Sequence, residues 1–338
     1  MTAPKRWHAR GLGLGLLVLS VALAVLGAAV GSTGLASMAS AWGDTISAQI
    51  VWDIRLPRSL GAWAAGALLG LGGAIAQGLF RNPLADPYLL GSASGASLGV
   101  ATAMALFGVT PMASAWAGRL GLTSAAFVGA VGAVVLTLLL ARGVQHTIRL
   151  LLAGVVVGVV LGAVGSLVLL LSPQTLLAMQ TFMLGSTSFV GWGACVLMVV
   201  VWLLCTALAW WMAPVLDGLA LGEFTARSLG LPLERTRALL VVVLGLATAT
   251  AVAQTGLIAF VGLAAPHVVR ALVRCSQGTL LLLSSAMGGV LLMAADLLAR
   301  GLVSPLELPV GLLTAVLGGG YLLWLMRRGS PTRFGGAP

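Results

Sequence analysis

The sequence predicts an all-α polytopic membrane protein, and three observations support this fold class. Of the 338 residues, 59% are hydrophobic and only 8% are charged, whereas soluble proteins carry about 25% charged residues. Apolar stretches of about 17–25 residues recur along the chain, which is the length that a helix needs to cross the hydrocarbon core of a bilayer. Strict alternation of apolar and polar residues over about ten positions, as in a membrane β-barrel, is not found.

Ten stretches are assigned as helical spans in chain order. Their approximate ranges are 11–31, 59–80, 92–109, 122–141, 150–172, 193–215, 238–253, 256–266, 279–299 and 309–326. The first is longer than the apolar core of a signal peptide, roughly 7–15 residues, so it is expected to be a membrane helix. The eighth is too short to cross alone and is expected to be buried among other helices. No linker divides the chain, so residues 1–338 are expected to form a single transmembrane domain.

With an even number of spans, both termini lie on one side of the membrane, and the basic residues indicate which side. If the N-terminus is cytoplasmic, 14 of the 18 Lys and Arg residues fall in cytoplasmic segments, and the other four are Arg55, Arg58, Arg119 and Arg300. Cytoplasmic flanks of spans are enriched in Lys and Arg, so both termini are expected in the cytoplasm. The same rule explains the net charge of +10, and because the basic residues are scattered, no nucleic-acid partner is expected.

Glycine and alanine recur at three- and four-residue spacing within the spans, as in GASLG, GGAIAQG and GVVVGVVLGAVG. Small residues at this spacing allow helix backbones to approach closely in lipid. The pattern favours tight helix packing, with the widening of a pathway as the alternative.

Residue patterns of several common catalytic sites are absent from the sequence. Lys5 is the only lysine and is followed by Arg6, so no phosphate-binding GxxxxGK[ST] loop exists. The three histidines are far apart with no HExxH, no GxSxG is present, and the three cysteines form no CxxC pair. We therefore expect no enzyme activity and no metal site in this chain. If ATP drives its function, the ATPase is expected to be another chain.

Three arginines lie on the expected outer side, although most basic residues fall on the cytoplasmic side. Arg55 and Arg58 precede the second span in VWDIRLPRSL, and Arg300 ends the ninth in AADLLARG. One interpretation is that they pair with Asp53 and Asp296. The other is that they dock a partner that presents carboxylates, which the guanidinium group binds in bidentate geometry.

The longest polar interval on the expected cytoplasmic side is LDGLALGEFTARSLGLPLERTR, residues 216–237. GEFTARSLG predicts a short amphipathic helix that ends at Gly230, with Pro232 close behind. Such a helix is either an interfacial loop or a contact for a soluble partner.

A break with two prolines follows the second span in RNPLADPYLLGSASGASLGV, residues 81–100. Pro83 and Pro87 end one helix and prevent immediate re-entry, and Asn82 and Asp86 suit turns at helix ends. This segment is either a plain turn or a constriction at the cytoplasmic mouth of a pathway.

The order and spacing of five motifs carry a resemblance to a known family. The motifs read IRLPRSLGAWAAGALLGLGGAIAQGLFRNPLADPYLLGSASGA, LALGEFTARSLGLP, GLIAFVGLAAPHVVR, ADLLAR and ELPVGLLTAVLGG, and the similarity runs from about Val51 to Arg328. The chain resembles the permease subunits of binding-protein-dependent ABC importers for ferric siderophores, haem and cobalamin. This resemblance implies the type II importer fold, a homodimer of ten-helix subunits in the bacterial inner membrane. It also implies two ABC ATPase subunits, which would bind ATP and Mg, one periplasmic binding protein, and no cofactor on this chain.

The resemblance further implies roles for individual residues. Glutamates of the binding protein would dock on Arg55, Arg58 and Arg300. Residues 217–232 would form coupling helices in clefts of the ATPases, with contacts from Leu219, Leu221, Gly222, Glu223, Ala226, Arg227 and Gly230. Two turns would form a cytoplasmic gate, Asn82, Pro83 and Leu84 in one and His146, Thr147 and Ile148 in the other. The fifth and tenth helices would line the central path, with Gly154, Gly158, Gly162 and Ser166 facing it.

The expected function is transport of an iron complex by alternating access. The apolar stretch 151–172 suits a large, flat, apolar cargo and favours haem, with a ferric siderophore or cobalamin as alternatives. A secondary transporter is the alternative of another class. It would need polar or ionisable groups in the middle of the membrane, for which Gln77, Gln254 and Asp296 are the candidates.

Overall fold

Each of the ten predicted spans overlaps a helix in the computed structural model, which describes residues 8–31, 34–35, 45–108, 116–141, 147–303 and 306–328. The helices are α1 (Ala9–Ala29), α3 (Leu56–Phe80), α4 (Ser92–Phe107), α5 (Trp116–Leu140), α6 (Thr147–Leu171), α8 (Trp192–Trp211), α11 (Leu233–Thr255), α12 (Val261–Leu272), α13 (Gln277–Gly301) and α14 (Val310–Arg328). In the described part of the chain, seven helices are long and apolar enough to cross a membrane. The apolar parts of α4, α12 and α14 are shorter.

Short elements connect these helices. They are α2 (Thr45–Gln49), the π-helix η2 (Ile50–Arg55), the 3-10 helices η3 (Pro87–Leu90) and η4 (Pro173–Thr175), and the helices α7 (Leu176–Leu184), α9 (Ala213–Ala220) and α10 (Glu223–Ser228). Two strands of two residues each, β1 (Val30–Gly31) and β2 (Gly34–Leu35), pair antiparallel after α1. The sequence did not predict this hairpin, but the fold is otherwise helical throughout the described residues.

The eighth span begins later than predicted. The prediction was 256–266, whereas α12 runs from Val261 to Leu272. Gly256 and Phe260 have φ angles of 69° and 68°, so residues 256–260 cannot continue a right-handed helix. The expectation that this helix is buried is confirmed, because half of its residues, among them Gly262 and Pro266, are buried.

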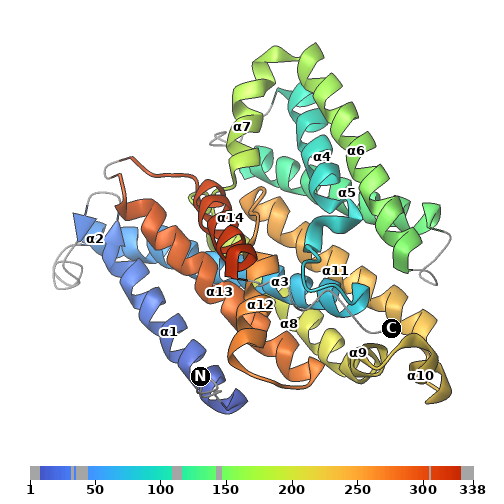
Figure 1. Cartoon of the computed structure of the whole chain (residues 1–338). Coiled ribbons are helices and arrows are strands. Elements are labelled where there is room, and N and C mark those ends of the chain that lie inside the picture. Colours follow the sequence, from blue (N-terminus) through green and yellow to red (C-terminus); the bar gives the residue numbers. More distant parts are fainter. Residues whose placement is uncertain are drawn as a thin grey trace.

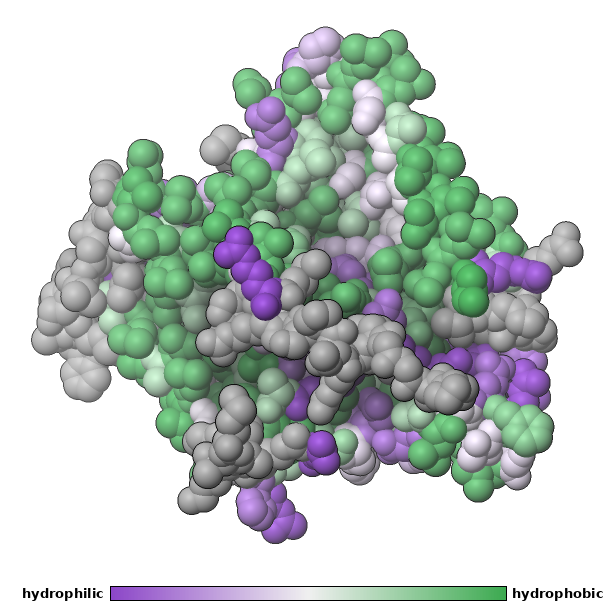
Figure 2. All heavy atoms as spheres, in the orientation of Figure 1, coloured by the Kyte–Doolittle hydropathy of each residue, from purple (hydrophilic) through white to green (hydrophobic). Residues whose placement is uncertain are grey.

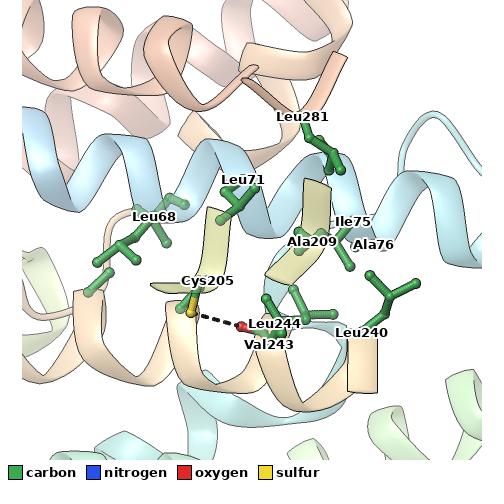
Figure 3. Close-up of a cluster of buried hydrophobic side chains, with 14 of the residues drawn as sticks. Leu68, Leu71, Ile75, Ala76, Cys205, Ala209, Leu240, Val243, Leu244 and Leu281 are labelled. Atoms are coloured by element: carbon green, nitrogen blue, oxygen red, sulfur yellow. Dashed lines mark hydrogen bonds between the residues drawn. The ribbon is translucent and has the colours of Figure 1, made fainter. Parts of the chain in front are cut away.

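Helix α3 lies at the centre of the protomer and α6 at its edge (Figure 1). In the most apolar 18-residue window, 89% of the α3 residues are buried against 11% for α6. Side chains of α3, α8, α11 and α13 meet in one apolar cluster, in which the Cys205 thiol donates to the Val243 carbonyl at 3.9 Å (Figure 3). The exposed surface of α6 and α7 is mostly apolar, whereas hydrophilic residues gather over α9 and α10 at the lower right (Figure 2).

Glycines set the distance between α3 and its neighbours. A Cβ atom at Gly66 would overlap the carbonyl oxygen of Gly288 on α13, and one at Gly288 would overlap the carbonyl oxygen of Gly66. One at Gly73 would overlap the carbonyl oxygen of Gly262 on α12, which Pro266 leaves without its helical donor. These small residues therefore serve close packing, as one of the two interpretations of their spacing predicted.

Three chain segments are joined by backbone hydrogen bonds at the end of α11 that lies far from α10. Ser186 donates to Thr255 at 2.8 Å, and Leu257 donates to Phe182 at 3.2 Å. Gly311, in the first turn of α14, donates to Gly185 at 3.3 Å. The C-terminal ends of α7 and α11 and the start of α14 therefore form one junction, which we call the outer junction.

We expect Gly288→Ala to destabilise the protein by about 1–3 kcal/mol, because the added methyl group forces α3 and α13 apart. The measurement is the midpoint of thermal unfolding of the purified protein, which should fall by several degrees. Gly132→Ala in α5 is the matched control, because nothing lies within 4 Å of the position of its Cβ atom. A midpoint for Gly288→Ala equal to that of the control would contradict the packing argument.

Candidate functional site

The expected coupling segment folds as two short helices that glycines separate and end. Gly222, between α9 and α10, has a φ angle of 111°, and Gly230, after α10, has a φ angle of 73°. Residues with a Cβ atom rarely adopt such φ angles, so both turns need glycine. Gly230 donates to the Arg227 carbonyl at 2.9 Å, and Leu231 donates to that of Ala226 at 3.3 Å. The predicted short helix that ends at Gly230 is confirmed.

One face of this segment is anchored and the other is exposed. Leu219 and Ala226 are completely buried, whereas Leu221, Phe224 and Leu229 expose 69%, 85% and 63% of their surface. We call these three side chains the coupling patch. They lie outside the helices that are long enough to cross a membrane. Exposed apolar groups with a polar surround are typical of a protein contact.

Glu223 links α10 to the N-terminal part of α11. Its carboxylate accepts from Arg237 Nη2 at 3.0 Å and from Arg227 Nη2 at 2.8 Å. The Arg237 side chain is 4% exposed, so the link reaches the interior. The hydrogen bond from Arg237 lowers the pKa of Glu223 below its usual value, and the charges of Arg227 and Arg81 act in the same direction against partial burial. The carboxylate therefore stays ionised at neutral pH.

The proline-rich break after α3 is a rigid turn. Arg81 takes a left-handed conformation, with a φ angle of 49°, and Asn82 donates back to the Gln77 carbonyl at 3.2 Å, which closes the helix as in a Schellman motif. The Asn82 side chain then accepts from the Leu84 amide at 2.9 Å across Pro83. Asn82, Pro83 and Leu84 are all exposed, so they are available to a neighbouring segment.

The second proline repeats this arrangement. The Asp86 carboxylate accepts from the Tyr88 amide at 2.8 Å across Pro87. The Tyr88 hydroxyl donates to the Ile258 carbonyl at 3.1 Å, which ties the turn to the segment before α12.

The second expected gate turn is only partly described. His146 lies outside the described residues, Thr147 begins α6, and Ile148 is 82% exposed. The gate role of both turns stays a prediction.

The four residues expected along the path do not share one environment. Gly154 is buried, because a Cβ atom there would overlap the Leu89 carbonyl, and Gly158 approaches Gly91 before α4. Gly162 and Ser166 are exposed. Each four-residue step turns a helix by about 40° beyond a full turn, so the series rotates from the packed face to the open one. Gly154 therefore packs inside the protomer, and the path role of the four residues stays a prediction.

Two of the three outer arginines are buried around one carboxylate. Asp296 is fully buried, and Arg58 and Arg300 are 7% and 2% exposed. Arg58 donates to Asp296 Oδ1 from Nε at 3.2 Å and from Nη2 at 3.1 Å, and Arg300 donates from Nη2 to Oδ2. Of the two interpretations of these arginines, pairing with Asp296 describes their state in this structure. Neither presents a free cation at the surface.

Polar groups that the sequence analysis did not single out complete this network, which we call the outer charge cluster. Glu307 accepts from Arg58 Nη1 at 2.8 Å, and Thr187 donates to Asp296 at 2.5 Å. Ser188 donates to Glu307 at 3.1 Å. Glu307 is the first residue of the motif ELPVGLLTAVLGG and one of only eight acidic residues in the sequence. Because acidic residues are so rare here, each could have been considered in the sequence analysis as a partner for the outer arginines.

Arg55 differs from the other two arginines. It is half-buried and donates from Nη1 to the carbonyls of Ala28 and Ala29 at 3.3 and 3.1 Å, at the end of α1. Asp53 is exposed and forms no ion pair with any described residue, so its predicted pairing is wrong for this structure. Arg55 is therefore the outer cation that a carboxylate of a partner could reach most directly.

Two of the three polar groups proposed for ion coupling, Gln77 and Asp296, are engaged in packing, whereas Gln254 forms no hydrogen bond with any described residue. Gln77 donates to the Leu263 carbonyl at 3.2 Å and accepts from Arg270, so it bridges α3 and α12. Asp296 belongs to the outer charge cluster. No group of three His, Cys, Asp or Glu side chains that could hold a metal ion occurs among the described residues.

Comparisons with known proteins agree with the motif resemblance. The FecCD transport family matches residues 14–328. The vitamin B12 import system permease protein BtuC of Salmonella paratyphi A is 39% identical over 321 residues, which cover 91% of this chain and 94% of that protein. The BtuC protein of Salmonella typhi is 38% identical over 322 residues with the same coverage.

Solved structures support the fold. An inward-facing conformation of a metal-chelate type ABC transporter superposes with a TM-score of 0.83 at 29% identity, covering 94% of this chain and 98% of that chain. PsaBC from Streptococcus pneumoniae shares the fold, with a TM-score of 0.59 at 18% identity over 85% of this chain. The chain therefore belongs to the FecCD transport family, as a multi-pass permease subunit of an ABC importer in the bacterial inner membrane.

Proposed function

We propose that this permease moves cobalamin from a periplasmic binding protein into the cytoplasm. The observation that carries the proposal is the 39% identity to a vitamin B12 import permease over 91% of the chain. The haem expectation rested on the apolarity of residues 151–172. These residues form most of α6, which is largely exposed on the protomer, so their hydropathy suits a partner subunit or lipid and carries no information on cargo. No comparison supports haem.

A second candidate cargo is a ferric siderophore. It is favoured by the similarity to the metal-chelate type transporter, which extends over 94% of this chain at 29% identity. The two candidates share a chemistry, because each is a large organic ligand that encloses a metal ion.

The same proposal includes the partners. A second copy of this chain covers the exposed faces of α6 and α14, where Val159, Leu170 and Val316 are 67%, 75% and 64% exposed. Two ABC ATPase subunits, which bind ATP and Mg, receive the coupling patch. One binding protein docks at the outer end. Separate subunits hydrolyse ATP, in keeping with the absence of a phosphate-binding loop from this sequence.

The proposed mechanism is alternating access. Closure of the ATPases displaces α10, and the Glu223–Arg237 pair passes this movement to α11. Helix α11 ends at the outer junction, where backbone hydrogen bonds connect it to α7 and, through Gly185, to α14. Each state of the cycle is populated according to the differential binding of ATP and of the binding protein.

The substrate is tested by uptake into proteoliposomes that contain this chain, its ATPase and its binding protein. Cobalamin, a ferric siderophore and haem are compared at equal concentration. We expect ATP-dependent uptake of cobalamin and at least tenfold less of the other two. Uptake of the siderophore alone would contradict cobalamin as the cargo and support the second candidate. Uptake of haem alone would contradict both candidates.

The coupling patch is tested by Phe224→Ala. Burial of a phenylalanine side chain contributes about 1.5–3 kcal/mol, so its loss should weaken ATPase association roughly tenfold or more. The measurement is co-purification of the ATPase together with transport rate. Leu204→Ala, at a 58% exposed position of α8, is the matched control and should leave both unchanged. Equal ATPase retention in the two variants would refute the contact.

The two kinds of outer arginine should respond differently to substitution. Arg55→Glu should weaken binding of the binding protein at least fivefold, mainly in the association rate at low salt, with only a small fall in the unfolding midpoint from the lost bonds to the Ala28 and Ala29 carbonyls. Arg300→Gln leaves Asp296 buried with one fewer ionic partner, which costs up to about 3–5 kcal/mol and lowers the unfolding midpoint. Surface plasmon resonance and thermal unfolding distinguish the two effects. If Arg300→Gln kept its midpoint but lost binding, Arg300 would instead contact the partner directly.

A further inference from the structure

Two adjoining cavities lie between α5, α8 and α11. One has a volume of about 510 Å³ and the other about 360 Å³. They have five lining residues in common, which are Thr123, Ser124, Leu197, Ala253 and Gln254. The two cavities are therefore parts of one groove, which we call the lateral groove.

The lateral groove is apolar at one end and polar at the other. The smaller cavity is lined mainly by apolar side chains, among them Phe127, Val201 and Leu246. The larger one adds Thr181, Ser186 and Thr255, close to the outer junction. On α11, Gln254 follows Leu246 by eight positions, so the lining extends about 12 Å along the helix axis. Its long direction therefore follows a membrane-spanning helix.

Three polar side chains in the lateral groove have no hydrogen-bond partner among the described residues. The hydroxyls of Thr181 and Thr255 donate to backbone carbonyls one turn earlier, at 3.4 and 2.9 Å. In contrast, the side chains of Thr123, Ser124 and Gln254 form no hydrogen bond with any described residue. Ser124 is exposed and Thr123 and Gln254 are half-buried, so all three are free to donate to a polar group from outside the chain.

The surroundings of the groove are apolar and exposed. Val128 on α5, Val200 on α8 and Val242 on α11 expose 68%, 48% and 53% of their surface. All three helices are among those long and apolar enough to cross a membrane. The groove therefore opens onto an exposed apolar surface of the protomer that suits contact with lipid. Helices α6 and α14, which are expected to line the transport path, contribute no residue to it.

We propose that the lateral groove binds one acyl chain of a phospholipid of the outer leaflet. The chain lies along Phe127, Val201 and Leu246, and the glycerol ester carbonyls accept hydrogen bonds from Gln254, Ser124 and Thr123. The volumes fall in the range of about 300–1,000 Å³ that is typical of small-ligand sites and are too small for a helix of a partner protein. No charged residue lines either cavity, so the ester region is recognised and the headgroup is not. The proposal does not depend on the identity of the cargo.

The test uses the full-length chain in bilayers that contain a phospholipid with a photoactivatable diazirine in its acyl chain. After illumination, the modified residues are mapped by mass spectrometry. We expect adducts concentrated on Phe127, Val201 and Leu246, with equal yields for phosphatidylethanolamine and phosphatidylglycerol. Adducts spread evenly over the exposed residues of α5 and α8, or yields that follow headgroup charge, would overturn the proposal.

Two variants and a control make the result specific. Ala253→Trp fills the groove and should reduce adducts at least tenfold, and Val200→Trp, on the lipid-facing surface of α8, should not. Gln254→Leu is close in size and removes only the amide, so it should reduce adducts severalfold even if Ala253→Trp fails to fold. Unchanged adducts in Gln254→Leu would refute ester recognition. Adducts from a free photoactivatable fatty acid but not from the phospholipid would mean that the groove binds a free fatty acid and would overturn the phospholipid proposal.

Discussion

The close approach of α3 to α13 and α12 is the constraint on which the rest of the structure depends. In lipid, apolar side chains gain little by leaving one hydrocarbon environment for another, so packing and hydrogen bonding hold helices together. Gly66 and Gly288 bring two backbones into direct contact, and Gly73 does the same for α12. The outer charge cluster and the Gln77 bridge both span these helix pairs, so their geometry is defined by the glycine contacts.

The outer charge cluster shows how charge is tolerated in such an environment. Burying Arg58, Arg300 and Asp296 separately would cost several kcal/mol for each ion. Here two guanidinium groups share Asp296, and Glu307 adds a second carboxylate at the rim, where its side chain is 28% exposed. The cluster joins α3, α13 and the segments after α7 and α13. It therefore defines the outer face to which a binding protein would come.

Much of the fold was predictable, because hydropathy over 20 residues reports directly on the membrane. All ten spans overlap observed helices, and the turns at Asn82 and Gly230 follow from residues with strong local preferences. The late start of α12 was not predictable, since the left-handed angle at Phe260 is imposed by tertiary packing. The pairing of Arg58 with Asp296 joins residues 238 positions apart, so pairing with Asp296 stayed one of two interpretations, because local patterns do not decide between contacts at such a separation. Cargo was not predictable for another reason, because apolarity that serves the bilayer says nothing about what passes through it.

The Glu223–Arg237 pair has a mechanical consequence. Helix α11 has 23 residues, so it extends about 35 Å from the coupling patch to the outer junction. A rod that is gripped at both ends tilts without bending, and a displacement of one end is delivered at the other. Because 67% of its most apolar window is buried within the protomer, the helix would tilt together with the helices packed on it. In the proposed mechanism, work done at one end of α11 would in this way reach the other end without any hydrogen bond breaking within the helix.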